Sequence, residues 1–85
     1  MKVIQSGIFK RKVKKLTKTQ KLQLDEVVMT ILTQPDIGDK KKGDLQGVYV
    51  YKFPMNNITH LIAFRFSTET LELIMLGPHE NHYRD

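Results

Sequence analysis

The sequence predicts an α+β domain in which a small antiparallel sheet carries two helices on one face. Apolar residues recur at helical spacing in the first half of the chain, whereas β-branched and aromatic residues dominate the second half. Turn-forming residues divide the second half at short intervals. With 85 residues, of which 40% are hydrophobic, the chain can bury one core. We therefore expect residues 1–85 to form a single domain with the element order β-α-α-β-β-β.

The first two elements are a short strand and a basic helix. Residues 2–6 fit a strand that Gly7 terminates. From Ile8 onwards the period changes, and Phe9, Val13 and Leu16 recur at i, i+4 and i+7. This spacing places a narrow apolar stripe along a helix whose other faces carry lysine and arginine. The helix is expected to pack through that stripe.

A second helix is expected to begin after Thr17. Thr17 and Gln20 have the spacing of a capping box, in which a hydroxyl and an amide satisfy free backbone groups at a helix start. Five apolar residues then repeat at helical spacing: Leu24, Val27, Val28, Ile31 and Leu32. The helix should end before Pro35, because proline disfavours helical geometry in the residue that precedes it.

The remainder is expected to be a loop followed by three strands. The stretch 35–47 is rich in glycine, aspartate and lysine, which favours a loop. Three runs of β-branched and aromatic residues predict strands at 48–53, 58–66 and 71–76. The connections 54–57 and 67–70 are short, which favours antiparallel hairpins.

Positive charge is concentrated in the first half of the chain. Residues 1–42 carry eleven Lys and Arg against four Asp and Glu, a balance of +7, whereas 43–85 carry three against five, a balance of −2. This asymmetry favours a polyanionic partner, either a nucleic acid or an acidic protein segment, over a basic surface kept only for solubility. The candidate RNA-binding cations are Lys10, Arg11, Lys12, Lys14, Lys15, Lys18, Arg65 and Arg84.

Several classes of protein are disfavoured. The chain has no cysteine, no apolar export segment and no run of the ~20 apolar residues that cross a bilayer, so we expect a soluble, cytoplasmic protein that spans no membrane. It lacks a phosphate-binding glycine motif, a nucleophile elbow and paired carboxylates. His79, Glu80 and His82 lie close together in sequence, but histidines at i, i+3 near a terminus are weak evidence for metal. We expect neither a metal nor another cofactor.

The second half carries side chains suited to cleaving RNA. Such cleavage takes a proton from the ribose 2′-hydroxyl and gives one to the departing 5′-oxygen, while cations stabilise charge on the phosphate. We nominate His79, His60, Lys52 and Tyr83 as the catalytic set. His79 follows the last strand, and one helical turn would bring Tyr83 onto the same face. An exposed polar tail is the structural alternative for both residues.

His60 and Lys52 lie on opposite arms of the hairpin through residues 56 and 57. They are expected to be cross-strand neighbours. The alternatives are a hydrogen-bonded sheet histidine and a solvated strand lysine. Strand alternation places Arg65 on the face opposite His60, unless a bulge intervenes.

Three segments together resemble the RelE/ParE superfamily of toxins from bacterial type II toxin-antitoxin systems. They are Phe9-Lys-Arg-Lys-Val-Lys-Lys-Leu16, Lys42-Gly-Asp-Leu-Gln-Gly-Val-Tyr-Val-Tyr-Lys-Phe53 and Leu76-Gly-Pro-His-Glu-Asn-His-Tyr-Arg-Asp85. The resemblance spans nearly the whole chain and implies the RelE-like fold. Its most specific parts are Leu45-x-Gly47 before a Tyr/Lys strand, and Gly77-x-His79-x-x-x-Tyr83 at the end.

RelE-like members are ribosome-dependent mRNA endoribonucleases that use the 2′-hydroxyl as nucleophile and thereby inhibit translation. By position, the resemblance implies that Lys52 contacts phosphate, that His79 and His60 transfer protons, and that Tyr83 stacks on a base or assists proton transfer. Val50 stands where some such toxins carry another cation, and Arg84 is a candidate replacement. The implied partners are a cognate antitoxin, the ribosome and mRNA.

Two other functions stay open at this point. A ParE-like toxin would bind DNA gyrase without nuclease chemistry, and an inactive homologue would only bind RNA. Apolar residues on both faces of the strand 58–66 further suggest that the antitoxin covers one face of the sheet.

Overall fold

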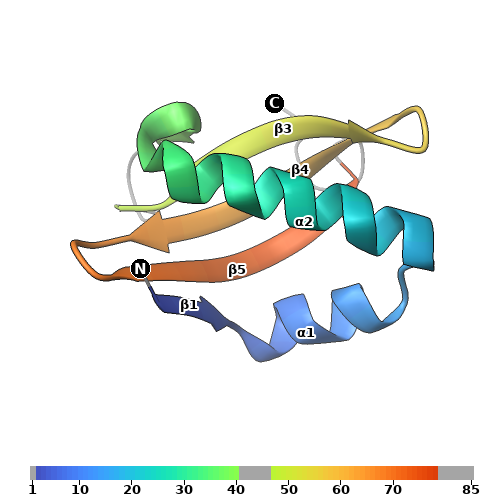
Figure 1. The fold of residues 1–85 in the computed structure, drawn as a ribbon, viewed down its shortest axis with the longest axis horizontal. Coiled ribbons are helices and arrows are strands. Elements are labelled where there is room, and N and C mark those ends of the chain that lie inside the picture. The colour runs from blue at the N-terminus through green and yellow to red at the C-terminus, as the bar shows by residue number, and fades with distance from the viewer. Residues whose placement is uncertain (1, 41–46, 79–85) are drawn as a thin grey trace.

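The computed structural model describes residues 2–40 and 47–78, and within these ranges five strands form one mixed sheet of order β1-β5-β4-β3-β2. In chain order the elements are β1 (Lys2–Gln5), α1 (Gly7–Lys14), α2 (Lys18–Thr33), the 3₁₀ turn η1 (Pro35–Ile37), β2 (Asp39–Lys40), β3 (Tyr49–Met55), β4 (Ile58–Phe66) and β5 (Thr70–Pro78). The helix α2 runs across one face of the sheet, and α1 lies along its β1–β5 side (Figure 1). The predicted α+β fold class is confirmed.

The three long strands are antiparallel, as predicted, but β1 pairs in parallel with β5 and makes the sheet mixed. The stretch expected to be a loop also differs. It contains η1, and β2 pairs with Tyr49 and Val50 of β3. Gly47, which leads into β3, has a φ of 79°, in the left-handed region that glycine adopts without strain. A short two-residue strand leaves little periodicity in the sequence, which is why β2 was not anticipated.

The helix α2 begins where its capping box predicts, whereas Gly7, the residue predicted to terminate the first strand, is the first residue of α1. Thr17 accepts a hydrogen bond from the Gln20 backbone at 3.1 Å, and the Gln20 side chain accepts one from the Thr17 backbone at 2.9 Å. The predicted capping box of α2 is therefore present. The helix ends at Thr33, and Gln34 before Pro35 has left helical geometry with φ −143° and ψ 80°.

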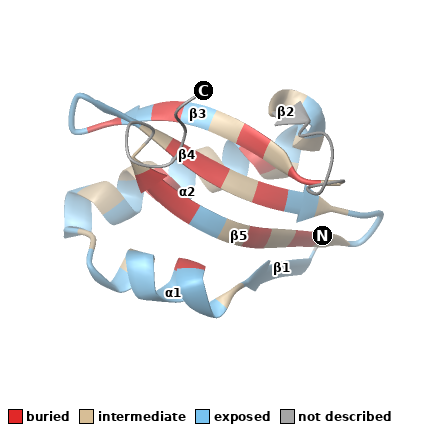
Figure 2. Cartoon of the chain, turned by 180° about the vertical axis from the view of Figure 1, so that it is seen from behind, coloured by how far each residue is buried: buried red, intermediate tan, exposed pale blue. Residues whose placement is uncertain are grey.

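The core lies between the helices and the face of the sheet that α2 covers. It contains Phe9 of α1, two residues of α2 and seven residues of the strands, namely Leu24, Ile31, Phe53, Met55, Ile62, Phe64, Leu71, Leu73 and Leu76. Val13 and Leu16 pack against it, so the predicted packing of the apolar stripe is confirmed, although α1 ends at Lys14 and Leu16 lies beyond the helix. Figure 2 views the sheet from the side opposite α2, and buried positions occur along β3, β4 and β5. There Leu61 is only 5% exposed, so this apolar position of β4 is not an open patch.

A bulge in β5 determines which of its residues face the helices. The pairs Ala63–Met75 and Phe64–Leu73 leave Ile74 as an extra residue on β5. The bulge shifts the alternation, so that Leu71, Leu73 and Leu76 all reach the core. The β4 side is uninterrupted, and His60, Ile62 and Phe64 keep one facing.

Ser6 ties α1 to this bulge. Its hydroxyl donates a hydrogen bond to the Ile74 carbonyl at 2.6 Å and accepts one from the Phe9 backbone at 3.0 Å. Its backbone N–H also donates to the Leu73 carbonyl at 2.9 Å. One residue therefore caps α1 and holds the start of that helix against β5.

No helix in the described part of the chain has the length and apolar character needed to cross a membrane.

Replacing Ser6 with alanine is expected to lower the free energy of unfolding by about 1–2 kcal/mol, because both the helix cap and the bond to Ile74 are lost. Chemical denaturation of the two proteins measures the difference. The matched control is Ser67→Ala, an exposed serine in the turn after β4, for which a change within about 0.5 kcal/mol is expected. Equal effects of the two substitutions would contradict the role given to Ser6.

Candidate functional site

His60 lies on β4, on the face that packs against the helices. It stands opposite Phe53 and Pro78 in the sheet, and its ring centroid is 6.1 Å from that of Phe53. The His60 Nδ1 lies 2.9 Å from the backbone oxygen of Ile58. Because a carbonyl oxygen can only accept a hydrogen bond, Nδ1 must be the donor. In the neutral ring, Nε2 therefore keeps a lone pair that can accept a proton.

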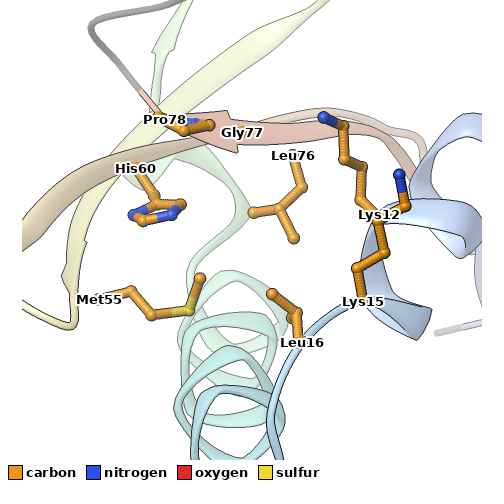
Figure 3. A pocket seen from close by; sticks show the side chains of 8 residues that line it. All are labelled: Lys12, Lys15, Leu16, Met55, His60, Leu76, Gly77 and Pro78. Carbon is orange, nitrogen blue, oxygen red and sulfur yellow. The ribbon is translucent and has the colours of Figure 1, made fainter.

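A cavity of about 200 Å³ opens beside this histidine. Its walls are Lys12, Lys15, Leu16, Met55, His60, Leu76, Gly77 and Pro78. The lysines of the α1 end stand on one side, His60 stands on the other, and Leu76 lies between them (Figure 3). Met55 and Leu76 are almost fully buried, so the cavity has an apolar floor beneath its cationic rim.

This arrangement combines a potential base with positive charge. The lysine side chains are exposed, whereas His60 is half-buried. A half-buried imidazole whose Nε2 carries a lone pair can take a proton from a hydroxyl, and ammonium groups can hold a phosphate. The cavity is therefore a candidate site for a phosphate ester.

Lys52 does not belong to this site. In the β3–β4 register Lys52 stands opposite Leu61, whereas His60 stands opposite Phe53. Residues that are paired in this way point to the same face, and neighbours along a strand point to opposite faces. The prediction that Lys52 and His60 are cross-strand neighbours is wrong, since they lie on opposite faces of the sheet.

The two-residue turn explains this error. Asn56 and Asn57 both have positive φ, 56° and 65°, and Met55 pairs directly with Ile58. This is the backbone of a tight type I′ hairpin, and it fixes the register of all the residue pairs between β3 and β4. The sequence predicts a turn over residues 54–57 but leaves the pairing of the strands open, and a shift of one residue reverses the facing.

Arg65 lies on the face opposite His60, as strand alternation predicts. Its guanidinium donates to the Glu72 carboxylate at 3.0 Å, across the β4–β5 pair. With both side chains at least 40% exposed, the ion pair contributes at most about 1 kcal/mol. Arg65 and Lys52 lie on the same face of the sheet, but they are far apart on it. Lys52 pairs with Leu61, and Arg65 lies four residues after Leu61 on β4, which is roughly 13 Å along the strand.

The candidate cations of the first half lie on or beside α1. Lys10, Arg11, Lys12 and Lys14 are within the helix, Lys15 is its C-cap, and Lys18 begins α2; all six are exposed. Cations near the end of α1 are stabilised by the negative end of the helix dipole. His79, Tyr83 and Arg84 lie outside the described residues.

The cavity could be foreseen only in part. Lys12 and Lys15 belong to the predicted RNA-binding set, and Leu16 to the predicted stripe. Met55, Leu76, Gly77 and Pro78 were not nominated, because apolar residues that line a cavity look like ordinary strand residues in the sequence. Within the described ranges, no group of three His, Cys, Asp or Glu residues could hold a metal ion.

Comparison with known proteins places the chain beside bacterial toxins. The family model described as the ParE-like toxin of type II bacterial toxin-antitoxin systems matches residues 3–85. No curated protein matches this chain.

Solved structures of E. coli RelE share the fold. The intact E. coli RelBE toxin-antitoxin complex matches at 18% identity with a TM-score of 0.70, over 89% of this chain and 93% of that one. The isolated E. coli RelE toxin matches at 17% identity and 0.70, over 99% and 86%. A doubly substituted E. coli RelE in the free state matches at 18% and 0.72, over 95% and 85%.

Cysteine pairs test the register that separates Lys52 from His60. The variant Lys52→Cys/Leu61→Cys should form an intramolecular disulfide under mild oxidation, because these residues stand directly opposite on one face. The variant Lys52→Cys/His60→Cys should not, because its Cβ atoms point to opposite faces. The natural chain has no cysteine, so thiol titration and mass spectrometry give an unambiguous result. A disulfide between positions 52 and 60 in folded protein would refute the register.

Proposed function

The chain belongs to the ParE-like toxin family of type II bacterial toxin-antitoxin systems, and we propose that it inhibits translation as a ribosome-dependent mRNA endoribonuclease. The observation that carries the nuclease assignment is the hydrogen bond from His60 Nδ1 to the Ile58 carbonyl, which leaves Nε2 able to accept a proton beside a lysine-rimmed cavity. The shared fold with E. coli RelE is consistent with this assignment.

The proposed reaction uses the RNA's own hydroxyl as nucleophile. His60 Nε2 accepts the 2′-hydroxyl proton, the 2′-oxygen attacks the adjacent phosphorus, and the bond from phosphorus to the 5′-oxygen breaks. The 5′-oxygen departs with a proton, for which we propose His79 as the donor. The products are a 2′,3′-cyclic phosphate and a 5′-hydroxyl. Tyr83 is proposed to stack on a neighbouring base.

The remaining cations are proposed to hold the RNA away from the reacting centre. Lys52 and Arg65 lie on the other face of the sheet, so we assign them to backbone contacts there and not to the reacting phosphate. The cations of α1 that do not line the cavity, Lys10, Arg11 and Lys14, are proposed to bind ribosomal RNA. This interaction weakens with rising salt, because counterions are released from the phosphates. We assign Arg84 to the same role.

A cognate antitoxin is the proposed regulator. The E. coli RelE structure in the RelBE complex is that of a toxin bound to its antitoxin. In this chain the exposed cations of α1 favour an acidic antitoxin segment as the ligand of that helix. Such a segment would block the α1 end of the cavity and keep the toxin from RNA. We propose that the toxin acts in the cytoplasm, where ribosomes are.

A second candidate is inhibition of DNA gyrase without nuclease activity. The observation that favours it is the separation of Lys52 from His60, which breaks up the catalytic set expected of a RelE-like nuclease. The name of the matching family model, ParE-like toxin, agrees with this alternative. DNA breaks that depend on gyrase, with mRNA left intact, would establish it.

The nuclease proposal predicts a specific loss in a purified translation system. His60→Gln should slow mRNA cleavage on programmed ribosomes by roughly a hundredfold or more, because a general base is removed. His79→Ala is expected to do the same. Primer extension locates the cuts, and end labelling identifies the 2′,3′-cyclic phosphate.

The third histidine is the matched control for this experiment. His82→Ala removes an imidazole that the proposed mechanism does not use, and it should cleave mRNA like the unsubstituted protein. If ribosome-bound mRNA stays intact with the unsubstituted protein, the nuclease proposal is refuted. If His60→Gln cleaves at the original rate, His60 is not the base.

A further inference from the structure

We infer that the cavity is a subsite for a single nucleotide, with Lys12 and Lys15 holding its phosphate and the apolar floor holding part of its base or ribose. This inference rests on the proposed function for the class of ligand, a ribonucleotide. It adds a phosphate-binding pair to the site in place of Lys52, and it separates the cations of α1 into two groups with different tasks.

Lys12 and Lys15 stand at the end of α1 that borders the cavity. At 100° per residue, Lys12 lies about 40° from Leu16 of the apolar stripe, and Lys15, the C-cap residue, follows about 60° from Lys12. Their stems can therefore run along apolar surface while the ammonium groups reach the cavity rim. Lys10 and Lys14 lie about 160° from Lys12 round the helix. Neither Lys10 nor Lys14 is one of the described residues that line the cavity.

The size and lining of the cavity suit part of one nucleotide. A volume of about 200 Å³ is below the roughly 300 Å³ at which sites for drug-sized ligands begin. It suits a phosphate with part of one nucleoside and is too small for several stacked bases. Leu16, Met55 and Leu76 offer apolar contact to a ring or a sugar, and His60 faces them across the cavity (Figure 3).

The cationic rim of the cavity is held in a fixed position. Ser6 holds the start of α1 on the β5 bulge, and Phe9 is buried in the core at 1% exposure. The capping box of Thr17 and Gln20 then fixes the start of α2 directly after Lys15 and Leu16. The lysines are thus carried by backbone anchored on both sides, which lowers the entropy lost when they bind a phosphate.

The test is the binding of adenosine 5′-monophosphate to the intact protein, measured by calorimetry and by NMR shift mapping. We expect shift changes at His60, Leu16, Met55 and Leu76. Lys12→Gln/Lys15→Gln should weaken binding by about tenfold or more, because charge-assisted hydrogen bonds to the phosphate are lost. Adenosine, which lacks the phosphate, should bind no better to the unsubstituted protein than to this variant.

A charge-matched variant on the same helix is the control. Lys10→Gln/Lys14→Gln also removes two positive charges, but it should change the affinity for the mononucleotide by no more than about twofold, because exposed charges beyond the cavity act only through screened attraction. It should weaken ribosome binding instead. Thermal unfolding should show that both variants remain folded, because all four lysines are exposed.

Each other outcome overturns the subsite. Equal losses for the two lysine pairs would mean diffuse attraction by α1, and adenosine binding as tightly as its monophosphate would mean that no phosphate is held. Shift changes away from the cavity, or no binding, would also refute it. The proposed nuclease is tested separately: a protein that binds the mononucleotide through Lys12 and Lys15 but leaves mRNA intact keeps the subsite and loses the nuclease.

Discussion

The register of the β3–β4 hairpin is the constraint on which the arrangement of polar side chains depends. Two consecutive asparagines with positive φ close the hairpin, and this turn determines which face of the sheet each residue of β3 and β4 points to. A slip of one residue on β4 would turn His60 onto the face of Lys52 and would also turn Ile62 and Phe64 out of the core. Because that core buries Phe64 and Ile62 completely, the packing energy enforces the same register that the turn prescribes.

The junction of α1 with β5 is the second element that shapes the site. The bulge at Ile74 rotates the last part of β5 so that Leu76 faces the helices, and the hydroxyl of Ser6 bonds to the carbonyl exposed there. From this anchor α1 runs along the sheet and ends beside the last residues of β5. The basic end of a surface helix is thereby brought to the same cavity as a histidine from the middle strand of the sheet.

The charge of the chain and the chemistry of the site are therefore linked through packing. A basic helix alone would bind any polyanion, and a sheet histidine alone would be one half-buried polar residue among many. Together they border a small cavity in which Nε2 of the histidine can accept a proton and ammonium groups can hold a phosphate. Lys52 and Arg65, on the other face, present a separate and weaker concentration of positive charge that Glu72 partly neutralises.

The sequence by itself determined the fold class, the start of α2 and the three long strands, because capping residues, apolar spacing and turn residues act over a few neighbouring positions. Phe9, Val13 and Leu16 were recognisable as a packing stripe for the same reason. The parallel pairing of β1 with β5, the short β2 and the bulge at Ile74 depend on contacts between distant segments, which leave no local pattern. Which charged residues share a surface was likewise decided only in the tertiary structure. His60 and Lys52 are eight residues apart in the chain, and their facing depends on a single-residue register that packing and turn geometry fix together.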